Sequence, residues 1–104
     1  MLSALLSHDV AGVEPLRDQS RRLLVRRGCR CGCGTIDFVP QSVDPPRSDL
    51  SGWFPVSGHV LDGDGNVIGG VIAFVDDGVL STLEVHGFDD ALAMPRVENV
   101  EWQL

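Results

Sequence analysis

The stretch "PVSGHVLDGDGNVIGGVIAFVDDGVLSTLEVH", residues 55–86, decides the fold. Its three apolar runs are rich in β-branched residues, and the segments DGDGN and DDG separate them. Glycine accepts the positive φ that tight hairpin turns require, so both segments predict hairpins. The stretch therefore predicts three antiparallel strands near residues 55–61, 66–76 and 79–86.

The register of these strands follows from asking which alignment gathers the apolar side chains on one face. A two-residue turn at Asp77-Gly78 places Ile72 opposite Leu83. A three-residue turn that ends at Gly65 places Val60 opposite Ile68. The predicted core face then holds seven residues, which are Val56, Val60, Ile68, Ile72, Phe74, Leu83 and Val85.

Two histidines share the opposite face in this register. His59 and His86 fall on either side of Gly69, about 9–10 Å apart across two strand spacings. Gly69 leaves no side chain between the rings, and Glu84 lies on the same face. Two imidazoles and a carboxylate are suitable ligands for a divalent metal, or suitable groups for acid–base chemistry. The alternative is a pair of half-exposed histidines that form no site.

Upstream of the hairpins, apolar residues at helical spacing predict two short helices at about 2–8 and 13–19. Residues 21–27 are interpreted as a strand that continues toward the cysteines, and residues 35–39 alternate as a further strand. The last segment, residues 96–104, fits a strand and a helix equally well, so both alternatives stay open.

The segment "RRGCRCGCGTIDF", residues 26–38, carries all three cysteines. In an extended chain Cys29, Cys31 and Cys33 point to one side. If the intervening glycines let the chain curl, the three thiolates could converge on zinc, with a histidine as fourth ligand. Nearby arginines would lower a thiol pKa and favour redox chemistry instead. A third interpretation is that the cysteines are small buried side chains.

Length and composition bound the class of protein. The 104 residues fit one domain, 1–104, and the formal net charge is −7. This charge argues against a general nucleic-acid binder, because phosphate contacts need Lys and Arg. Without a basic start or a long apolar run the chain predicts no membrane span, and three closely spaced cysteines favour a reducing, cytoplasmic location.

The charge is divided unevenly along the chain. Residues 1–30 hold six arginines and three acids, whereas residues 31–104 hold two arginines and twelve acids. This asymmetry could orient a head-to-tail association between copies.

Together these patterns predict a single α+β domain, in which short N-terminal helices cover one face of a mainly antiparallel sheet of four to six strands. The first functional hypothesis is a non-enzymatic binding or interaction protein, which could be a homodimer through the free sheet face or an edge strand. The middle strand is apolar on both faces, so Val71, Ala73 and Val75 would need cover from a dimer partner or the C-terminal segment. The second hypothesis is a small metal-binding protein or metalloenzyme that uses the cysteines or the His59/His86 pair.

The chain also resembles a group of small bacterial proteins with no assigned activity. That group combines a C-x-C-G-C-x-T-[IV]-[DE] segment with a DG-x-L-x-x-LE hairpin. The resemblance spans most of residues 10–86 and implies a small stand-alone domain without implying a function. The positions that carry it are Cys29, Cys31, Gly32, Cys33, Thr35, Asp37, Gly78, Leu83 and Glu84.

Overall fold

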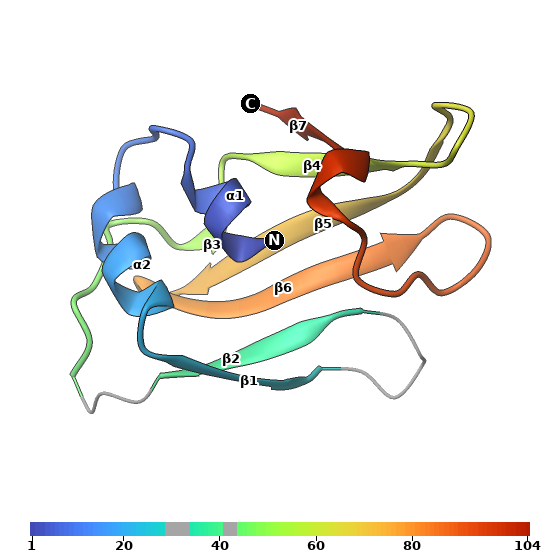
Figure 1. Ribbon diagram of the computed structural model, residues 1–104. Coiled ribbons are helices and arrows are strands. Elements are labelled where there is room, and N and C mark those ends of the chain that lie inside the picture. Colours follow the sequence, from blue (N-terminus) through green and yellow to red (C-terminus); the bar gives the residue numbers. More distant parts are fainter. Residues whose placement is uncertain (29–33, 41–43) are drawn as a thin grey trace.

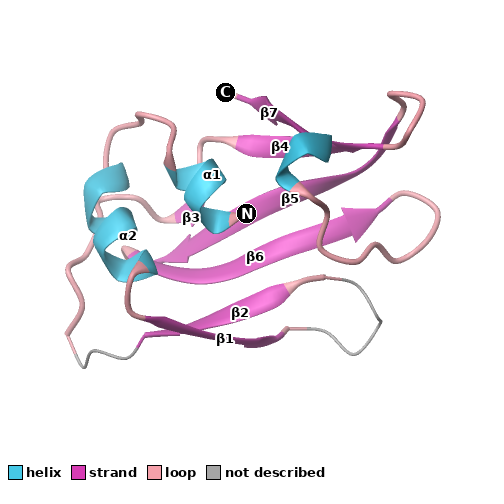
Figure 2. Cartoon of the chain, in the orientation of Figure 1, coloured by secondary structure: helices cyan, strands magenta, loops and turns pink. Residues whose placement is uncertain are grey.

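A computed structural model describes residues 1–28, 34–40 and 44–104. In these residues two short helices lie on one side of an antiparallel sheet of seven strands, which is an α+β arrangement (Figures 1 and 2). The sheet is larger than the four to six strands expected. The elements are α1 (Leu2–Leu6), α2 (Val13–Ser20), β1 (Leu23–Arg27), β2 (Ile36–Pro40), β3 (Gly52–Trp53), β4 (Ser57–Leu61), β5 (Val67–Asp76), β6 (Val79–Gly87), the 3₁₀ turn η1 (Val97–Asn99) and β7 (Val100–Gln103).

The strands follow the order β1-β2-β6-β5-β4-β7, and β3 pairs with β5 beyond the end of β4. Every neighbouring pair on this path is antiparallel. In the described chain β1 and β7 therefore form the two edges of the sheet (Figure 1). Because an odd number of antiparallel steps separates them, β1 and β7 run in opposite directions.

The two hairpin turns have the predicted glycine chemistry. Asp77 and Gly78 have positive φ values of 49° and 82°, and Asp76 pairs with Val79, so a two-residue turn connects β5 and β6. Such a turn twists in the same sense as the strands it joins. In the β4–β5 turn, Gly65 has a φ of 84°.

Beyond each turn, the register differs from the prediction by one residue. The pair Val75–Leu80 is followed by Phe74–Thr82, so β6 contains one extra residue. The pair Leu61–Val67 is followed by pairing of Val60 with a glycine two positions further along β5, so β5 also contains one extra residue. These irregularities are β-bulges, which place two residues opposite one.

The bulges invert the predicted face of β5. Val71, Ala73 and Val75 are buried in the core, and Ile72 and Phe74 lie on the opposite face, which corrects the prediction for these residues. Ile68, at the start of the strand, packs against the core as predicted. The predicted core residues outside β5 are buried as predicted; they are Val60 of β4, Val56 just before β4, and Leu83 and Val85 of β6. No dimer partner is needed to cover Val71, Ala73 and Val75, because the chain's own core covers them.

The helices cover this core face (Figure 1). Leu5 and Leu6 of α1 and Val13 and Leu16 of α2 are all buried in the cluster that includes Val71, Ala73 and Val75 of β5. Burying side chains of this size contributes about 1.5–3 kcal/mol each, which fixes the helices on one side.

Gln19 connects α2 to the β5–β6 turn and is buried, with 3% of its surface exposed. Its Nε2 donates to the carbonyl oxygens of Pro46, at 2.6 Å, and Gly78, at 2.8 Å. Its Oε1 accepts the Leu80 N–H at 2.8 Å. The amide therefore satisfies three backbone groups that the apolar core could not.

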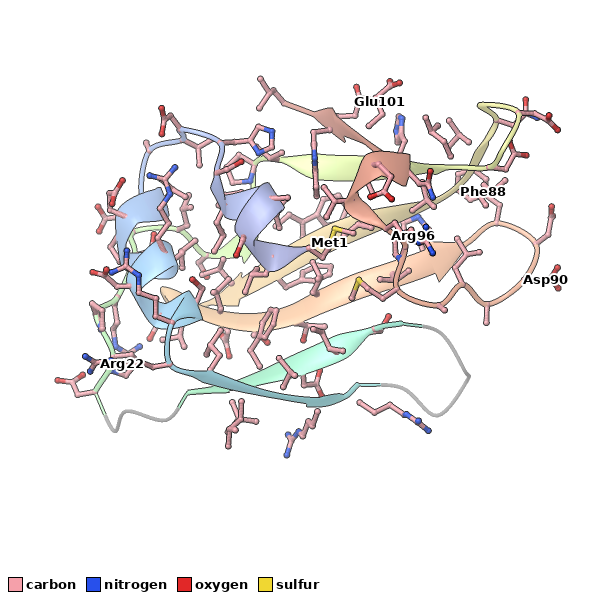
Figure 3. All side chains as sticks on the ribbon, viewed as in Figure 1. Met1, Arg22, Phe88, Asp90, Arg96 and Glu101 are labelled. Carbon is pink, nitrogen blue, oxygen red and sulfur yellow. The ribbon has the colours of Figure 1, made fainter. Side chains whose placement is uncertain are left out.

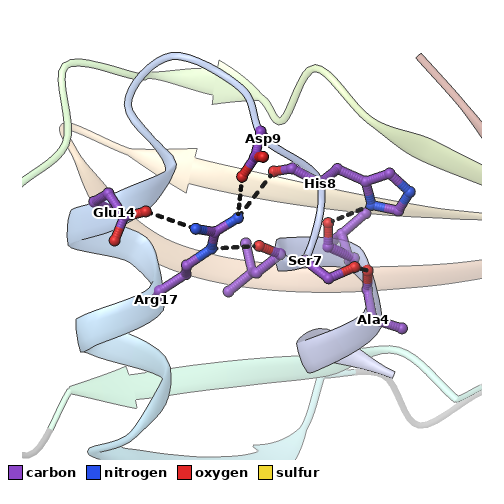
Figure 4. Close-up of polar contacts among 8 residues, drawn as sticks. Ala4, Ser7, His8, Asp9, Glu14 and Arg17 are labelled. Carbon is purple, nitrogen blue, oxygen red and sulfur yellow. Dashed lines mark hydrogen bonds and ion pairs between the residues drawn. The ribbon is translucent and has the colours of Figure 1, made fainter.

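Arg17 joins α2 to the end of α1 (Figure 4). Its Nε donates to the Leu6 carbonyl oxygen at 2.7 Å, and its Nη atoms pair with Asp9 at 3.0 Å and Glu14 at 2.6 Å. The side-chain hydrogen bond to Asp9 is the main cause that raises the pKa of Arg17. The guanidinium thereby holds two helices that are each too short to be stable alone.

The structure decides the open question at the C-terminus. Residues Val97–Asn99 form a 3₁₀ turn, and Val100–Gln103 form β7, which pairs with β4. Val100 is buried, and Trp102 packs against the core with its ring 5.6 Å from that of His8.

Candidate functional site

The edge strand β1 exposes apolar side chains on both of its faces. Leu24 is 58% exposed and Val25 is 59% exposed, on opposite faces of the same strand. Four exposed arginines accompany them, which are Arg21, Arg22, Arg26 and Arg27. An edge strand with apolar side chains and unpaired backbone groups is a template for pairing with another strand.

The backbone of β1 offers its outward groups at alternate residues. The Gly28 N–H donates to the Thr35 carbonyl oxygen at 3.0 Å. In an antiparallel ladder, hydrogen-bonded pairs alternate with pairs whose backbone groups point away. Counting back from Gly28, the backbone N–H and C=O groups of Arg26 and Leu24 therefore point toward β2. The N–H and C=O groups of Leu23, Val25 and Arg27 point out of the sheet.

The same counting applies to the middle of the sheet. The Phe54 N–H donates to the Ala73 carbonyl oxygen at 2.9 Å, so the odd-numbered residues near Ala73 direct their backbone groups toward β3 and β4. Val71 is one of these residues, and its partner is Gly58. Gly58 therefore directs its backbone groups to β5.

At the other edge, β7 also has alternating outward groups. Because Gly58 faces β5, the next residue, His59, directs its groups to β7, where its partner is Glu101. The backbone N–H and C=O groups of Glu101 therefore point toward β4. Those of Val100 and Trp102 point out of the sheet. The Glu101 side chain is exposed.

The two edges carry opposite charges. Figure 3 shows Arg22 at the start of β1 and Glu101 on β7, on opposite sides of the sheet. Two of the arginines have acidic neighbours: Arg21 lies 3.4 Å from Asp18, and Arg26 lies 3.9 Å from Asp37. With four arginines and two acids, the β1 edge remains locally basic. At the β7 edge Arg96 lies 4.0 Å from Glu98, and Glu101 leaves this edge locally acidic.

A hollow of about 420 Å³ lies at the end of β1. Its lining includes Val25, Arg26 and Arg27 of β1, together with Ile36 and Met94. The hollow gives a side chain from an added strand some space beside Val25.

The histidine pair predicted from the sequence lies on one face, around a different glycine. His59 and His86 both pair with Gly70, where Gly69 was expected. The two bulges shift both hairpins in the same direction, so the histidines still flank a common glycine. The His86 ring lies over Gly70, where an added Cβ would come within 2.6 Å of Cε1.

Chemically, the histidine row offers limited coordination. The His86 Nδ1 is buried without a hydrogen-bond partner in the described chain and lies 3.8 Å from Glu84 Oε1. Among residues 1–28, 34–40 and 44–104 no three His, Cys, Asp or Glu side chains are grouped closely enough to hold a metal ion. Cys29, Cys31 and Cys33 lie outside the described residues, so the zinc prediction for them stays a prediction.

The sheet face opposite the helices holds a cross-strand row of mixed character. Trp53 is 72% exposed and meets the Phe74 ring edge-on at 6.1 Å. Next to Phe74 in the row, the Thr82 hydroxyl donates to Asp37 Oδ1 at 3.2 Å, and Asp37 pairs with Arg26.

Sequence reasoning did not identify β1 as a candidate interface. Its apolar residues were assigned to a strand, but nothing in the pattern "RRLLVRR" shows that the strand lies at an edge. The signal that pointed there was the concentration of arginines in residues 1–30.

Comparisons with protein-family models, with curated proteins and with solved structures find no match to this chain. The resemblance to small bacterial proteins thus stays a prediction. No helix in the described residues is long and apolar enough to cross a membrane.

Proposed function

We propose that this chain is a non-enzymatic protein-interaction domain that binds an extended acidic segment along β1. The observation that carries the proposal is the outward direction of the backbone groups of Leu23, Val25 and Arg27, beside exposed apolar side chains. Main-chain hydrogen bonds give affinity in strand addition, and the side chains give specificity. The arginines favour a partner strand that carries carboxylates.

An NMR titration tests the proposal. The probe is a seven-residue peptide that alternates glutamate with valine or threonine, with a lysine-containing peptide of the same pattern as control. The outward amides of Leu23, Val25 and Arg27 should shift more than the inward amides of Leu24 and Arg26. Equal shifts of all five amides, or no shifts at all, would contradict strand addition at this edge.

Two variants of Val25 separate the contribution of its backbone N–H to peptide binding from that of its side chain. Val25→Pro removes an outward N–H and should abolish binding of the acidic peptide. Val25→Thr keeps that N–H and should retain most of the binding. Unchanged binding by the proline variant would show that the peptide uses another surface.

A second candidate function, a small metal-binding protein, is favoured by the row His59–Gly70–His86. Gly70 has no side chain, so the His86 ring lies over its backbone on the face that His59 shares, and an ion bound at this face would have both imidazoles as candidate ligands. A zinc titration that shifts the ring protons of both histidines, and that loses this effect in His86→Asn, would support it. Shifts of one histidine alone would refute a shared ion.

A further inference from the structure

We infer that the strand bound by β1 is β7 of a second copy of this chain, so that copies associate head to tail. This inference rests on the proposed function and names its partner. β1 and β7 run in opposite directions, so a copy displaced across the sheet without being turned over brings its β7 antiparallel to β1. The helix-covered faces of both copies then lie on the same side.

Among the registers that satisfy the backbone groups of both edges, one also overlaps the whole of β7 with β1. Placing Val25 opposite Trp102 aligns residues whose N–H and C=O groups both point outward, as the ladders within the sheet require. Moving either strand by one residue would align an outward-facing residue with an inward-facing one. The register also lets the half-buried Trp102 cover Val25, which is 59% exposed.

The same register pairs unlike charges. Arg26 falls opposite Glu101, and both side chains lie on the face opposite the helices. Directly opposed ions of unlike charge stabilise a strand pair, and like charges destabilise it. A two-fold pairing of β1 with β1 would instead collect the arginines of both copies, and β7 with β7 would collect their glutamates.

The net charge of −7 opposes association at long range. At physiological ionic strength, however, charges are screened over about 8 Å, so the local pair at the edge is not cancelled by distant acids. Four or five paired residues make a small interface, of the size class typical of weak, transient complexes. Association should therefore depend on protein concentration.

Head-to-tail pairing leaves one free edge at each end, so copies can continue to add. Each antiparallel step in a sheet adds a twist of about −20 to −25°. Successive copies would therefore be rotated about the growth axis, giving an open helical assembly.

Sedimentation velocity over a range of protein concentrations, with charge-reversed variants, tests this inference. The wild type should form species larger than dimers as concentration rises. Arg26→Glu and Glu101→Arg should each weaken association about tenfold. Asp89→Arg, which changes the net charge as much as Glu101→Arg but lies in the exposed turn after β6, away from both edge strands, is the matched control and should associate at least as well as the wild type.

Mixing the two charge-reversed variants gives the decisive measurement. Each variant alone places like charges at the pair, whereas the mixture restores an unlike pair at every junction and should recover association. Because Arg26 also lies beside Asp37, NMR is used to check that Arg26→Glu is folded. If Arg26→Glu unfolds, the weakened association of Glu101→Arg still tests the charge pair. A wild-type chain that remains monomeric, or that stops at a dimer, would overturn the inference.

The peptide titration separates this failure from failure of the proposed function. If the chain is monomeric and the acidic peptide still shifts the outward β1 amides, strand binding stands and the self-partner is wrong. If neither occurs, both proposals are wrong.

Discussion

Proline substitutions at two neighbouring positions of β1 should have very different effects on stability. Leu24 and Val25 have almost equal exposures, 58% and 59%, so loss of side-chain contacts cannot separate them. The alternation counted from Gly28 directs the Leu24 N–H toward the carbonyl of Val39 and the Val25 N–H toward solvent. Leu24→Pro removes a ladder donor, whereas Val25→Pro removes a solvated one.

The difference can be estimated from three contributions. Leu24→Pro loses a backbone hydrogen bond, leaves the Val39 carbonyl without its partner, and places the proline ring between two strands. Together these should lower the free energy of unfolding by about 2–4 kcal/mol. For Val25→Pro the fixed φ also restricts the unfolded chain, so the change should stay within about 1 kcal/mol.

Urea unfolding followed by tryptophan fluorescence measures both effects, with Leu24→Ala and Val25→Ala as side-chain controls. The unfolding midpoint of Leu24→Pro should fall by more than about 1 M relative to its alanine control. Amide hydrogen exchange gives an independent result, since Val25 should exchange faster than Leu24. If Val25→Pro proves as destabilising as Leu24→Pro, the assigned backbone direction is wrong, and the proposed strand-binding edge is wrong with it.

Three further outcomes follow from the contacts in the sheet and its turns. Gln19→Leu should lower the free energy of unfolding by about 2–4 kcal/mol in urea titrations, because the Leu80 N–H and the Pro46 carbonyl lose their partner and the Gly78 carbonyl keeps only the Ser48 N–H. An effect below about 1 kcal/mol would contradict that role. Gly69→Ala should lower the free energy of unfolding by about 3 kcal/mol in the same assay, because its Cβ would meet the backbone of β6. Gly70→Ala should leave that free energy nearly unchanged, because only the His86 ring must turn. Equal losses of stability in the two variants would refute the distinction. Hydrogen bonds to Asp62, first from the Asn66 N–H, lower the pKa of its carboxyl below 3.8. The ionised Asp62 carboxylate therefore stabilises the fold at pH values above 3.8, and this stabilisation is lost as the pH falls through the lowered pKa. The difference in Tm between wild type and Asp62→Asn should shrink between about pH 6 and pH 2, and a difference that widens would contradict the assignment.

The turns of this fold could be predicted from the sequence because they depend on local chemistry. Asp77-Gly78 and Gly65 have the positive φ that their residue types favour, and the positions of the flanking strands follow from those turns. Turn chemistry fixes the first pair of each hairpin. It says nothing about residues several positions further along, where the register is set by packing.

The register could not be predicted because β5 is apolar on both faces. Ile72 and Phe74 are as suitable for a core as Val71 and Ala73, so alternation does not choose between them. The choice is made by two bulges, whose extra residues carry no distinctive sequence signal. The sequence nevertheless predicted the common partner of His59 and His86 to within one residue, because both bulges displace the strands in the same direction. The predicted partner was Gly69, and the observed partner is Gly70.

The candidate interface was beyond sequence reasoning for a different reason, since an edge is a property of the whole sheet. Charged residues on an edge strand are usually understood as protection against unwanted pairing, because like charges on two approaching strands repel. That protection depends on whether the charges on the two strands have the same sign. Arginines on β1 exclude a second β1, and Glu101 on β7 excludes a second β7, but neither excludes the other. A chain that carries its positive and negative edges on one sheet is therefore protected against symmetric pairing and left open to head-to-tail pairing, which the mixed-variant experiment measures directly.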